Sequence, residues 1–222
     1  MPVRAVIFDM DGVLVDSYQA HLKSWQALAR AHGRQFTERQ FAASFGQTSR
    51  EIIRHYWSDI VAEVDVAAWD AQKEEFYRDL LRTDFPEMDG AGELVRALRD
   101  AGFALAIGSS GPPENVEIVI DLLPAGHLFD ITVSGMDVER GKPNPDVFLK
   151  AAAKLSIEAK SCLVVEDAPV GVEAARRAGM AVVAITGTAQ RAKLAVADLV
   201  VDSLRELTVE VLTGLIEANR SG

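Results

Sequence analysis

The stretch that decides the fold is Val3-Arg-Ala-Val-Ile-Phe-Asp9-Met-Asp11-Gly12-Val-Leu-Val-Asp16. Its apolar first part predicts a buried strand, which ends at two carboxylates one residue apart. Ligands of an open parallel sheet bind beyond the carboxyl ends of its strands, so we expect Asp9 and Asp11 in a functional crevice. Carboxylates this close repel each other unless a cation lies between them, and Mg²⁺ is the natural choice. A solvated acidic turn after a strand would have the same sequence pattern.

The composition predicts a folded protein and excludes some partners. With 222 residues, 49% hydrophobic and 25% charged, the chain can form one domain plus a small insertion. Its net charge of −10 argues against nucleic acid and anionic membranes as partners, and a phosphate site would need local positive groups. The single Cys162 is expected in a buried strand and excludes an intrachain disulfide. Without a membrane-span or signal-peptide pattern, we expect a cytoplasmic protein.

Strand and helix patterns alternate along most of the chain, which predicts an α/β fold, a Rossmann-like doubly wound parallel sheet. The expected strands are Val3–Phe8, Phe103–Gly108, Ile131–Ser134, Ser161–Val165, Ala181–Ile185 and a weak one at Leu199–Val201. The expected helices between them are Ala91–Ala101, Glu114–Leu123, Asp146–Leu155, Val170–Ala178 and a last one near Ser203–Glu217.

The first two strands are too far apart for an ordinary crossover, which takes about 30 residues. The excess is helical in pattern and predicts a small all-α cap domain over residues 16–86, inserted into a core of residues 1–15 and 87–222. Its place after the first strand is where a lid would exclude water and contact substrate. The helical patterns are Tyr18–Ala31, Thr37–Phe45, Ser49–Trp57 and Val66–Leu81.

Three further motifs follow later strands. Ser109-Ser110-Gly111 opens a helix and offers hydroxyl and amide groups to a phosphate, although an N-cap would look the same. Lys142 lies in Gly-Lys-Pro-Asn-Pro-Asp, a loop that two prolines hold extended; alone it would be a solvated lysine. Glu166-Asp167 ends the fourth strand. Acids for a metal, a hydroxyl for phosphate and one lysine together indicate phosphoryl transfer.

In this order, the motifs resemble the haloacid dehalogenase superfamily of phosphatases, in its β-phosphoglucomutase-like and phosphoglycolate phosphatase-like subgroup with a helical cap. The resemblance implies that Asp9 is the nucleophile of an aspartyl-phosphate and Asp11 the acid and base. It implies that Ser109 binds the phosphoryl group, with Ser110 beside it, and that Lys142 bridges that group and Asp9. Mg²⁺ would be held by Asp9, the backbone carbonyl of Asp11 and Asp167, with Glu166 close by or linked through water.

The resemblance also implies substrate contacts from the cap. His21 and Trp25, four residues apart, match a pattern of the mutase-like subgroup, although both could simply pack the helical domain. The Gly46–Arg50 segment resembles the lid loop that sets specificity, and Lys73 stands where relatives carry a lysine facing the site. A surface lysine paired with Glu74 or Glu75 would be the plainer interpretation of Lys73.

The sequence favours a phosphatase that hydrolyses a small phosphorylated metabolite, such as a sugar or polyol phosphate. Sugar phosphomutases of this group carry polar and basic residues after the phosphate-binding serine, where this chain has Gly111, Pro112 and Pro113. A phosphomutase remains the alternative, and a non-catalytic metabolite-binding protein is more remote. A response-regulator receiver would lack the long insertion. We expect a monomer.

Overall fold

The computed structural model describes residues 3–44 and 48–222, which fold as two compact units. The first unit is Met1–Asp16 with Pro86–Gly222, and the second is Ser17–Phe85. The chain leaves and re-enters the first unit through paired segments. The amide of Asp16 donates to the carbonyl of Pro86 at 2.8 Å, and the amide of Met88 donates to the carbonyl of Leu14 at 3.0 Å. Val15 and Glu87 form an antiparallel bridge between these hydrogen bonds.

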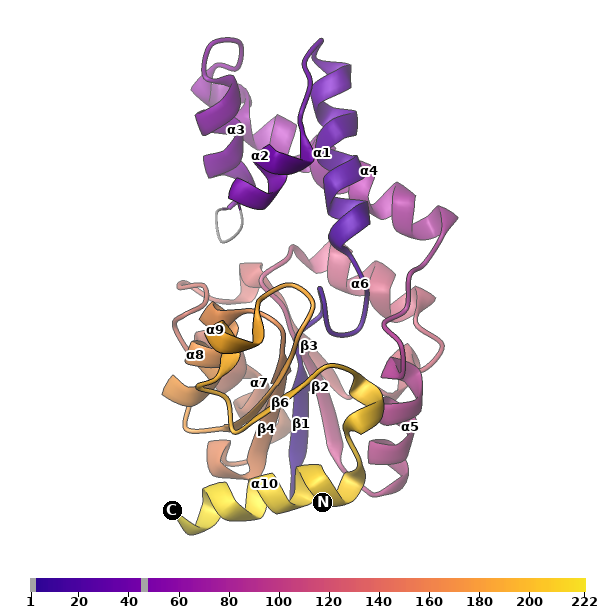
Figure 1. The fold of residues 1–222 in the computed structure, drawn as a ribbon, viewed down its shortest axis with the longest axis vertical. Coiled ribbons are helices and arrows are strands. Elements are labelled where there is room, and N and C mark those ends of the chain that lie inside the picture. The colour runs from indigo at the N-terminus through magenta and orange to yellow at the C-terminus, as the bar shows by residue number, and fades with distance from the viewer. Residues whose placement is uncertain (1–2, 45–47) are drawn as a thin grey trace. The chain divides into compact units, whose positions relative to one another are not determined.

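The first unit is built on a parallel sheet with the strand order β3-β2-β1-β4-β5-β6 (Figure 1). This confirms the predicted α/β class and puts the decisive stretch on a central strand, with β2 on one side and β4 on the other. Parallel strands that are covered on both faces are apolar, and the inner strands β1, β2 and β5 contain only apolar residues and glycine. The strands are β1 Ala5–Phe8, β2 Ala104–Gly108, β3 Ile131–Val133, β4 Cys162–Glu166, β5 Ala181–Ile185 and β6 Leu199–Val201.

Helices cover both faces of this sheet (Figure 1). Ala5 and Ile7 of β1 face a core shared with α7 and α8, whereas Val6 and Phe8 are equally buried on the other face. There α5 packs against β2, and α10 packs against β4 and β5. The helices of this unit are α5 Ala91–Asp100, α6 Pro113–Leu122, α7 Asp146–Leu155, α8 Pro169–Arg177, α9 Arg191–Leu194 and α10 Val209–Ser221, with 3-10 turns η2 Gly126–Leu128, η3 Gly135–Asp137, η4 Ala159–Ser161 and η5 Leu204–Glu206.

The element boundaries differ from the sequence prediction mainly at the C-terminus. The last helix was expected from Ser203, but the chain first forms the 3-10 turn η5, capped by the Ser203 side chain. Helix α10 then begins after Thr208, whose hydroxyl accepts from the amide of Val211 at 3.3 Å. Two side chains that can cap a helix lie five residues apart, so the pattern alone did not separate the turn from the helix. The short α9 was not predicted.

The second unit is helical, as the sequence predicted, and has a core of its own. Trp25, Phe36, Trp57 and Trp69 pack together, with neighbouring ring centroids 5.6 to 5.9 Å apart. The capping boxes at Thr37 and Thr48 fix the starts of α2 and α3. The elements are α1 Tyr18–Ala31, α2 Glu38–Ala43, α3 Ser49–Trp57, η1 Glu63–Asp65 and α4 Val66–Thr83.

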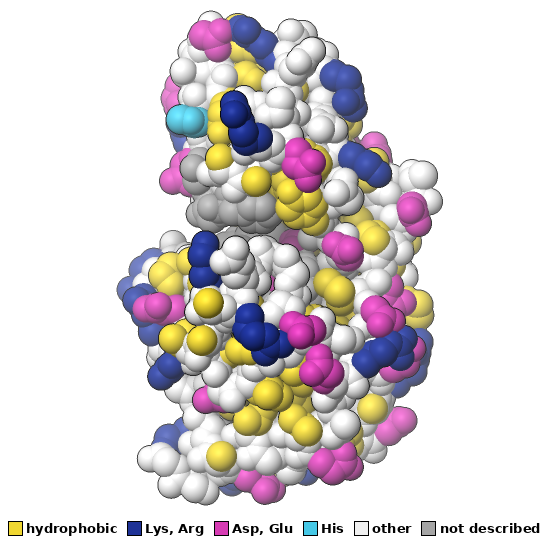
Figure 2. Space-filling model, in the orientation of Figure 1, with side chains coloured by type: hydrophobic (Ala, Val, Ile, Leu, Met, Phe, Trp, Pro, Cys, Tyr) yellow, Lys and Arg dark blue, Asp and Glu magenta, His cyan; other side chains and the backbone are white. Residues whose placement is uncertain are grey.

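The charged surface and the burial of the single cysteine agree with what the composition predicts. On the face shown in Figure 2, Lys and Arg side chains are interspersed with Asp and Glu. Cys162 is a buried free thiol on β4, and burial raises its pKa to about 12. Among the helices of the described residues, none has the length and hydropathy needed to cross a membrane.

Asp137 provides a pH-dependent contribution to stability. Its carboxylate accepts hydrogen bonds from the backbone amide and hydroxyl of Ser134, both at 2.9 Å, and these lower its pKa from 3.8 to about 2. Because the native pKa is the lower one, the ionised carboxylate stabilises the fold above pH 4, and the contribution is lost as the pH falls towards 2. We expect Asp137→Asn to lower the free energy of unfolding at pH 7 by about 1 kcal/mol.

Urea unfolding at several pH values measures this effect. The difference between wild type and Asp137→Asn should shrink between pH 4 and pH 2. Asp100→Asn, at an exposed aspartate of the same unit, is the matched control and should stay near wild type throughout. A difference of constant size across this range would contradict the assignment.

Candidate active site

Two neighbouring strands bring three carboxylates together at one edge of the sheet. Phe8 of β1 pairs with Val165 of β4, and the next amide, that of Asp9, donates to the carbonyl of Val165 at 2.9 Å. Asp9 therefore lies beside Glu166 and Asp167, and one oxygen atom from each of the three lies within 4.8 Å of the other two. All three side chains are buried. The strand ends predicted from the sequence thus meet in a single acidic cluster.

Lys142 inserts its ammonium group into this cluster. Its Nζ atom donates to Oδ1 of Asp9 at 2.5 Å and to Oε1 of Glu166 at 2.6 Å. The ammonium also lies 4.9 Å from the ring centroid of Phe148, on α7. Its neighbour Arg140 behaves differently, because it pairs with Asp146 near the surface. The structure therefore excludes the plainer interpretation of Lys142 as a solvated lysine.

The electrostatics of the cluster favour an additional positive charge. Burial, together with the charges of Glu166 and Asp11, raises the pKa of Asp9 to about 7 against the lowering effect of Lys142. Burial, followed by the charges of Glu166 and Asp9, raises the pKa of Asp167 well above its usual range. Burial lowers the pKa of Lys142, but the charges and hydrogen bonds of Asp9 and Glu166 outweigh burial, so the pKa is raised. One ammonium does not balance these acids, so ionising all of them costs free energy.

The residues present fit a hard divalent cation such as Mg²⁺, which prefers carboxylate oxygens. The local backbone makes room for such a centre. Gly12 has a φ of +77°, and an ideal Cβ on it would lie only 2.0 Å from Oδ2 of Asp167. Asp11 is half-buried in the tight turn after β1, where its charge acts on Asp9. A cation bound here would supply electrostatic stabilisation of phosphoryl oxygens.

Ser109 follows β2, the other neighbour of β1. Ile107 pairs with Phe8, which places Ser109 at the same edge of the sheet as Asp9. Ser109 is buried, and its Oγ atom accepts a hydrogen bond from the amide of Gly111 at 3.0 Å. Ser110 is exposed. A hydroxyl at this edge has the chemistry to bind a phosphoryl oxygen, and the role of Ser109 in phosphate binding stays a prediction.

Within the helical unit, two of the predicted cap residues, His21 and Lys73, are in contact. Lys73 is buried, and its Nζ atom lies 2.9 Å from Nδ1 of His21 and 2.9 Å from Oε1 of Glu74. The ring of Tyr77 stacks on His21 with the centroids 4.1 Å apart. The pairing of Lys73 with Glu74 is therefore internal to the unit and not a surface contact. Tyr77 was not predicted from the sequence, although its i, i+4 spacing from Lys73 could have indicated it.

Arg50, another of the cap predictions, pairs outside this group. Arg50 donates from Nε to Oδ2 of Asp70 at 3.0 Å, so its charge is already paired within the helical unit. Gly46, predicted for the lid loop, lies outside the described residues.

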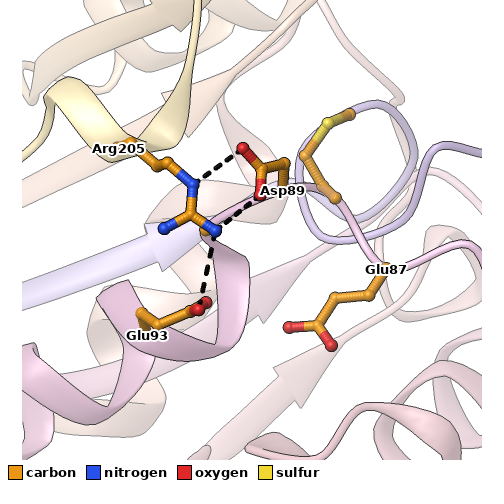
Figure 3. Close-up of a pocket in the computed structure, with 6 residues that line it drawn as sticks. Glu87, Asp89, Glu93 and Arg205 are labelled. Carbon is orange, nitrogen blue, oxygen red and sulfur yellow. Dashed lines mark hydrogen bonds and ion pairs between the residues drawn. The ribbon is translucent and has the colours of Figure 1, made fainter.

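A cavity of about 200 Å³ elsewhere in the α/β unit does not suit a phosphate. Figure 3 shows the guanidinium of Arg205 turned towards Asp89 and Glu93, and it donates twice to Asp89, at 2.7 and 2.8 Å. Three carboxylates against one paired guanidinium disfavour an anion. The lining residues are Glu87, Met88, Asp89, Gly90, Glu93 and Arg205.

Comparisons with known proteins show which family this chain resembles. The sequence model of a hydrolase family, the haloacid dehalogenase-like hydrolases, matches residues 3–179. Hexitol phosphatase A of Escherichia coli K12 is 35% identical over 212 residues, covering 94% of this chain and 95% of that protein. β-Phosphoglucomutase of Bacillus subtilis 168 is 30% identical over 223 residues, covering 95% and 94%. A crystal structure of a family IA, variant 3 HAD hydrolase from Entamoeba histolytica superposes with a TM-score of 0.86 at 28% identity, covering 96% of this chain and 99% of that one.

The space left by Gly12 can be tested directly. In Gly12→Ala, the new methyl group would displace the carboxylate of Asp167, and the left-handed backbone would cost about 1–2 kcal/mol of stability. We expect the Kd for Mn²⁺, used as a probe for Mg²⁺, to rise at least about tenfold, because an oriented ligand is lost. Electron paramagnetic resonance of Mn²⁺ titrations measures that Kd.

Gly102→Ala is the matched control. Gly102 has a similar φ of +81°, and nothing lies within 4 Å of its ideal Cβ. It should therefore lose similar stability while keeping its Mn²⁺ affinity. Equal Mn²⁺ affinities in the two variants would show that Gly12 does not shape a metal site.

Proposed function

The chain belongs to the haloacid dehalogenase-like hydrolases, and on that premise we propose that it is a Mg²⁺-dependent phosphatase of small phosphorylated metabolites. The observation that carries this proposal is the buried cluster in which the ammonium of Lys142 contacts Asp9 beside Asp167. Such a group can hold a nucleophilic carboxylate, a cation and a phosphoryl group in one place. Mg²⁺ would be held by Asp9, Asp167 and the backbone carbonyl of Asp11.

The proposed reaction has two displacement steps. A carboxylate oxygen of Asp9 attacks phosphorus and the bond to the ester oxygen breaks, while Asp11 donates its proton to the leaving alkoxide. Asp11, now a carboxylate, accepts a proton from water as that water attacks phosphorus. The bond between phosphorus and Asp9 then breaks, which releases inorganic phosphate and restores both side chains.

Positive charge at the cluster would lower the barrier of each step. Hydrolysis of phosphate monoesters is so slow in water that the site must remove on the order of 25 kcal/mol of barrier. Lys142 is buried and bound to Asp9, so its charge is close to the phosphoryl oxygens on which negative charge develops. Ser109 would donate a hydrogen bond to the same group.

The loop after Ser109 favours a phosphatase over a phosphomutase. A phosphomutase must hold a second phosphate, yet Pro112 is the N-cap and Pro113 the first residue of α6, and Gly111 has no side chain. No side-chain donor is available at these three positions. The hexitol phosphatase relative supports a sugar or polyol phosphate as substrate. A phosphomutase stays the second candidate, because the β-phosphoglucomutase relative covers nearly the whole chain.

We further propose that the enzyme acts as a monomer in the cytoplasm. The net charge of −10 and the mixed charges of Figure 2 support a small-molecule partner over nucleic acid or an anionic membrane.

The decisive assay is phosphate release from a panel of hexose 1- and 6-phosphates, polyol phosphates, phosphoglycolate and pyrophosphate. We expect release that requires Mg²⁺, stops with a chelator and falls at least about 10³-fold in Asp9→Asn, because the nucleophile is removed. If β-glucose 1-phosphate is instead converted to the 6-phosphate with little phosphate released, the protein is a mutase. If no substrate is turned over and the Asp9→Asn variant binds a metabolite as well as the wild type does, the protein is a non-catalytic binding protein.

The cap prediction for Lys73 is tested with a second pair of variants. We expect Lys73→Met to lower kcat/KM at least about tenfold, equivalent to about 1.4 kcal/mol of transition-state binding, and Lys23→Met, at an exposed lysine of α1, to leave it unchanged. Thermal unfolding of both variants controls for the loss of the ion pair between Lys73 and Glu74. A folded Lys73→Met enzyme with wild-type kcat/KM would remove Lys73 from the substrate site.

A further inference from the structure

We propose that Thr188, in the segment between β5 and α9, is a positioning residue that orients the Asp167 carboxylate for a metal ion. The inference rests on the proposed function, because the metal site belongs to the proposed phosphatase. No site residue after β5 was predicted from the sequence. The family model matches residues 3–179, so position 188 also lies outside the matched residues.

The chain after β5 returns to the edge of the sheet where the acids lie. Ala184 of β5 pairs with Glu166 of β4, so β5 ends beside the acidic cluster. Gly187 then has a φ of +134°, a conformation that residues other than glycine rarely adopt. The turn at Gly187 directs the next residue, Thr188, back towards the acids.

Thr188 lies where Asp167 and the turn after β1 meet. An ideal Cβ on Gly12 would lie 2.0 Å from Oδ2 of Asp167 and 3.0 Å from Oγ1 of Thr188, so both oxygens lie next to the backbone of that glycine. Burial and the neighbouring acids raise the pKa of Asp167, whereas a hydrogen bond from the Thr188 side chain lowers it. The hydroxyl thus favours the ionised carboxylate, which is the form that binds a cation.

Two contacts anchor the segment that carries Thr188, and both are made with Asp202, which follows β6. The hydroxyl of Thr186 donates to Oδ1 of Asp202 at 2.7 Å, and Nη2 of Arg191 forms an ion pair with the same oxygen at 2.8 Å. Arg191 also donates from Nη1 to the carbonyl of Val200 at 2.8 Å. The chain on both sides of Thr188 is therefore held at the end of β6, although Thr188 itself is exposed.

A donor fixed in this way limits how the Asp167 carboxylate can turn. Repulsion from Asp9 and Glu166 favours rotation of this carboxylate away from the cluster. The Thr188 hydroxyl occupies one lone pair of the carboxylate and leaves the others for a cation. Groups that orient a metal ligand typically contribute roughly 10- to 100-fold to metal affinity.

The first experiment measures Mn²⁺ binding to the full-length, metal-free protein by electron paramagnetic resonance, without substrate. We expect the Kd to rise at least about tenfold in Thr188→Val, which keeps the shape of the side chain but removes the hydroxyl. Thr188→Ser restores the donor and should bind Mn²⁺ nearly as the wild type does. The proposal is overturned if Thr188→Val binds Mn²⁺ as tightly as the wild type, or if Thr188→Ser binds it as weakly as Thr188→Val.

Gln190→Ala is the matched control, because it removes another exposed polar side chain of the same segment. Its Kd for Mn²⁺ should equal that of the wild type. A Kd raised as much in Gln190→Ala as in Thr188→Val would overturn the proposal, because the effect would then belong to the segment and not to the hydroxyl. Circular dichroism separates misfolding from lost affinity, and Thr188→Ala decides the question if Thr188→Val does not fold.

The second experiment tests whether Thr188 acts through Asp167. We expect Thr188→Val to weaken Mn²⁺ binding no further in an Asp167→Asn background. Fully additive losses would overturn the proposal, because Thr188 would then act on the ion or on another ligand. In the phosphatase assay, Thr188→Val should need more Mg²⁺ for half-maximal activity and regain wild-type kcat at saturating Mg²⁺. A wild type without turnover that shows these Mn²⁺ affinities would refute the phosphatase function and leave the role of Thr188 supported.

Discussion

The ammonium of Lys142, bound between Asp9 and Glu166, is the contact on which the rest of the site depends. The four inner strands of the sheet are buried throughout, and two of them, β1 and β4, lead into acids at the same edge. Carboxylates in such surroundings are costly to ionise, because burial and mutual repulsion both oppose the charge. Lys142 relieves part of this cost and leaves a remainder that a divalent cation can relieve. The same imbalance that would destabilise an ordinary core therefore prepares this edge for cations and phosphoryl groups.

Glycines shape the site as much as the charged side chains do. Gly12 leaves the space that Asp167 occupies, and Gly171 lets α8 lie against Glu166. In both places a backbone segment and a carboxylate approach each other more closely than any residue with a Cβ would allow. The acids are thus held by packing as well as by hydrogen bonds, which is what a preorganised electrostatic site requires.

Much of this could be predicted from the sequence, and what could not has a physical reason. The ends of parallel strands meet at one edge, so Asp9, Ser109 and Glu166 could be placed together from their positions after apolar runs. The spacing of the motifs in the sequence does not determine which oxygen of Glu166 accepts from which donor, because that depends on the backbone at the start of α8. In the helical unit, His21 and Lys73 are 52 residues apart, and only the folded unit shows that they touch. Competing capping side chains at Ser203 and Thr208 likewise hid the turn before α10.

The paired segments around Val15 and Glu87 have a consequence for how such proteins diversify. The chain departs and returns at adjacent backbone positions, joined by hydrogen bonds that belong wholly to the α/β unit. An inserted segment of any length could begin and end there without changing the register of β1 or the position of Asp9. The helical unit has its own aromatic core, so its sequence can drift or be exchanged as a module. Evolution could then change what the enzyme accepts while the reactive edge of the sheet stays constant.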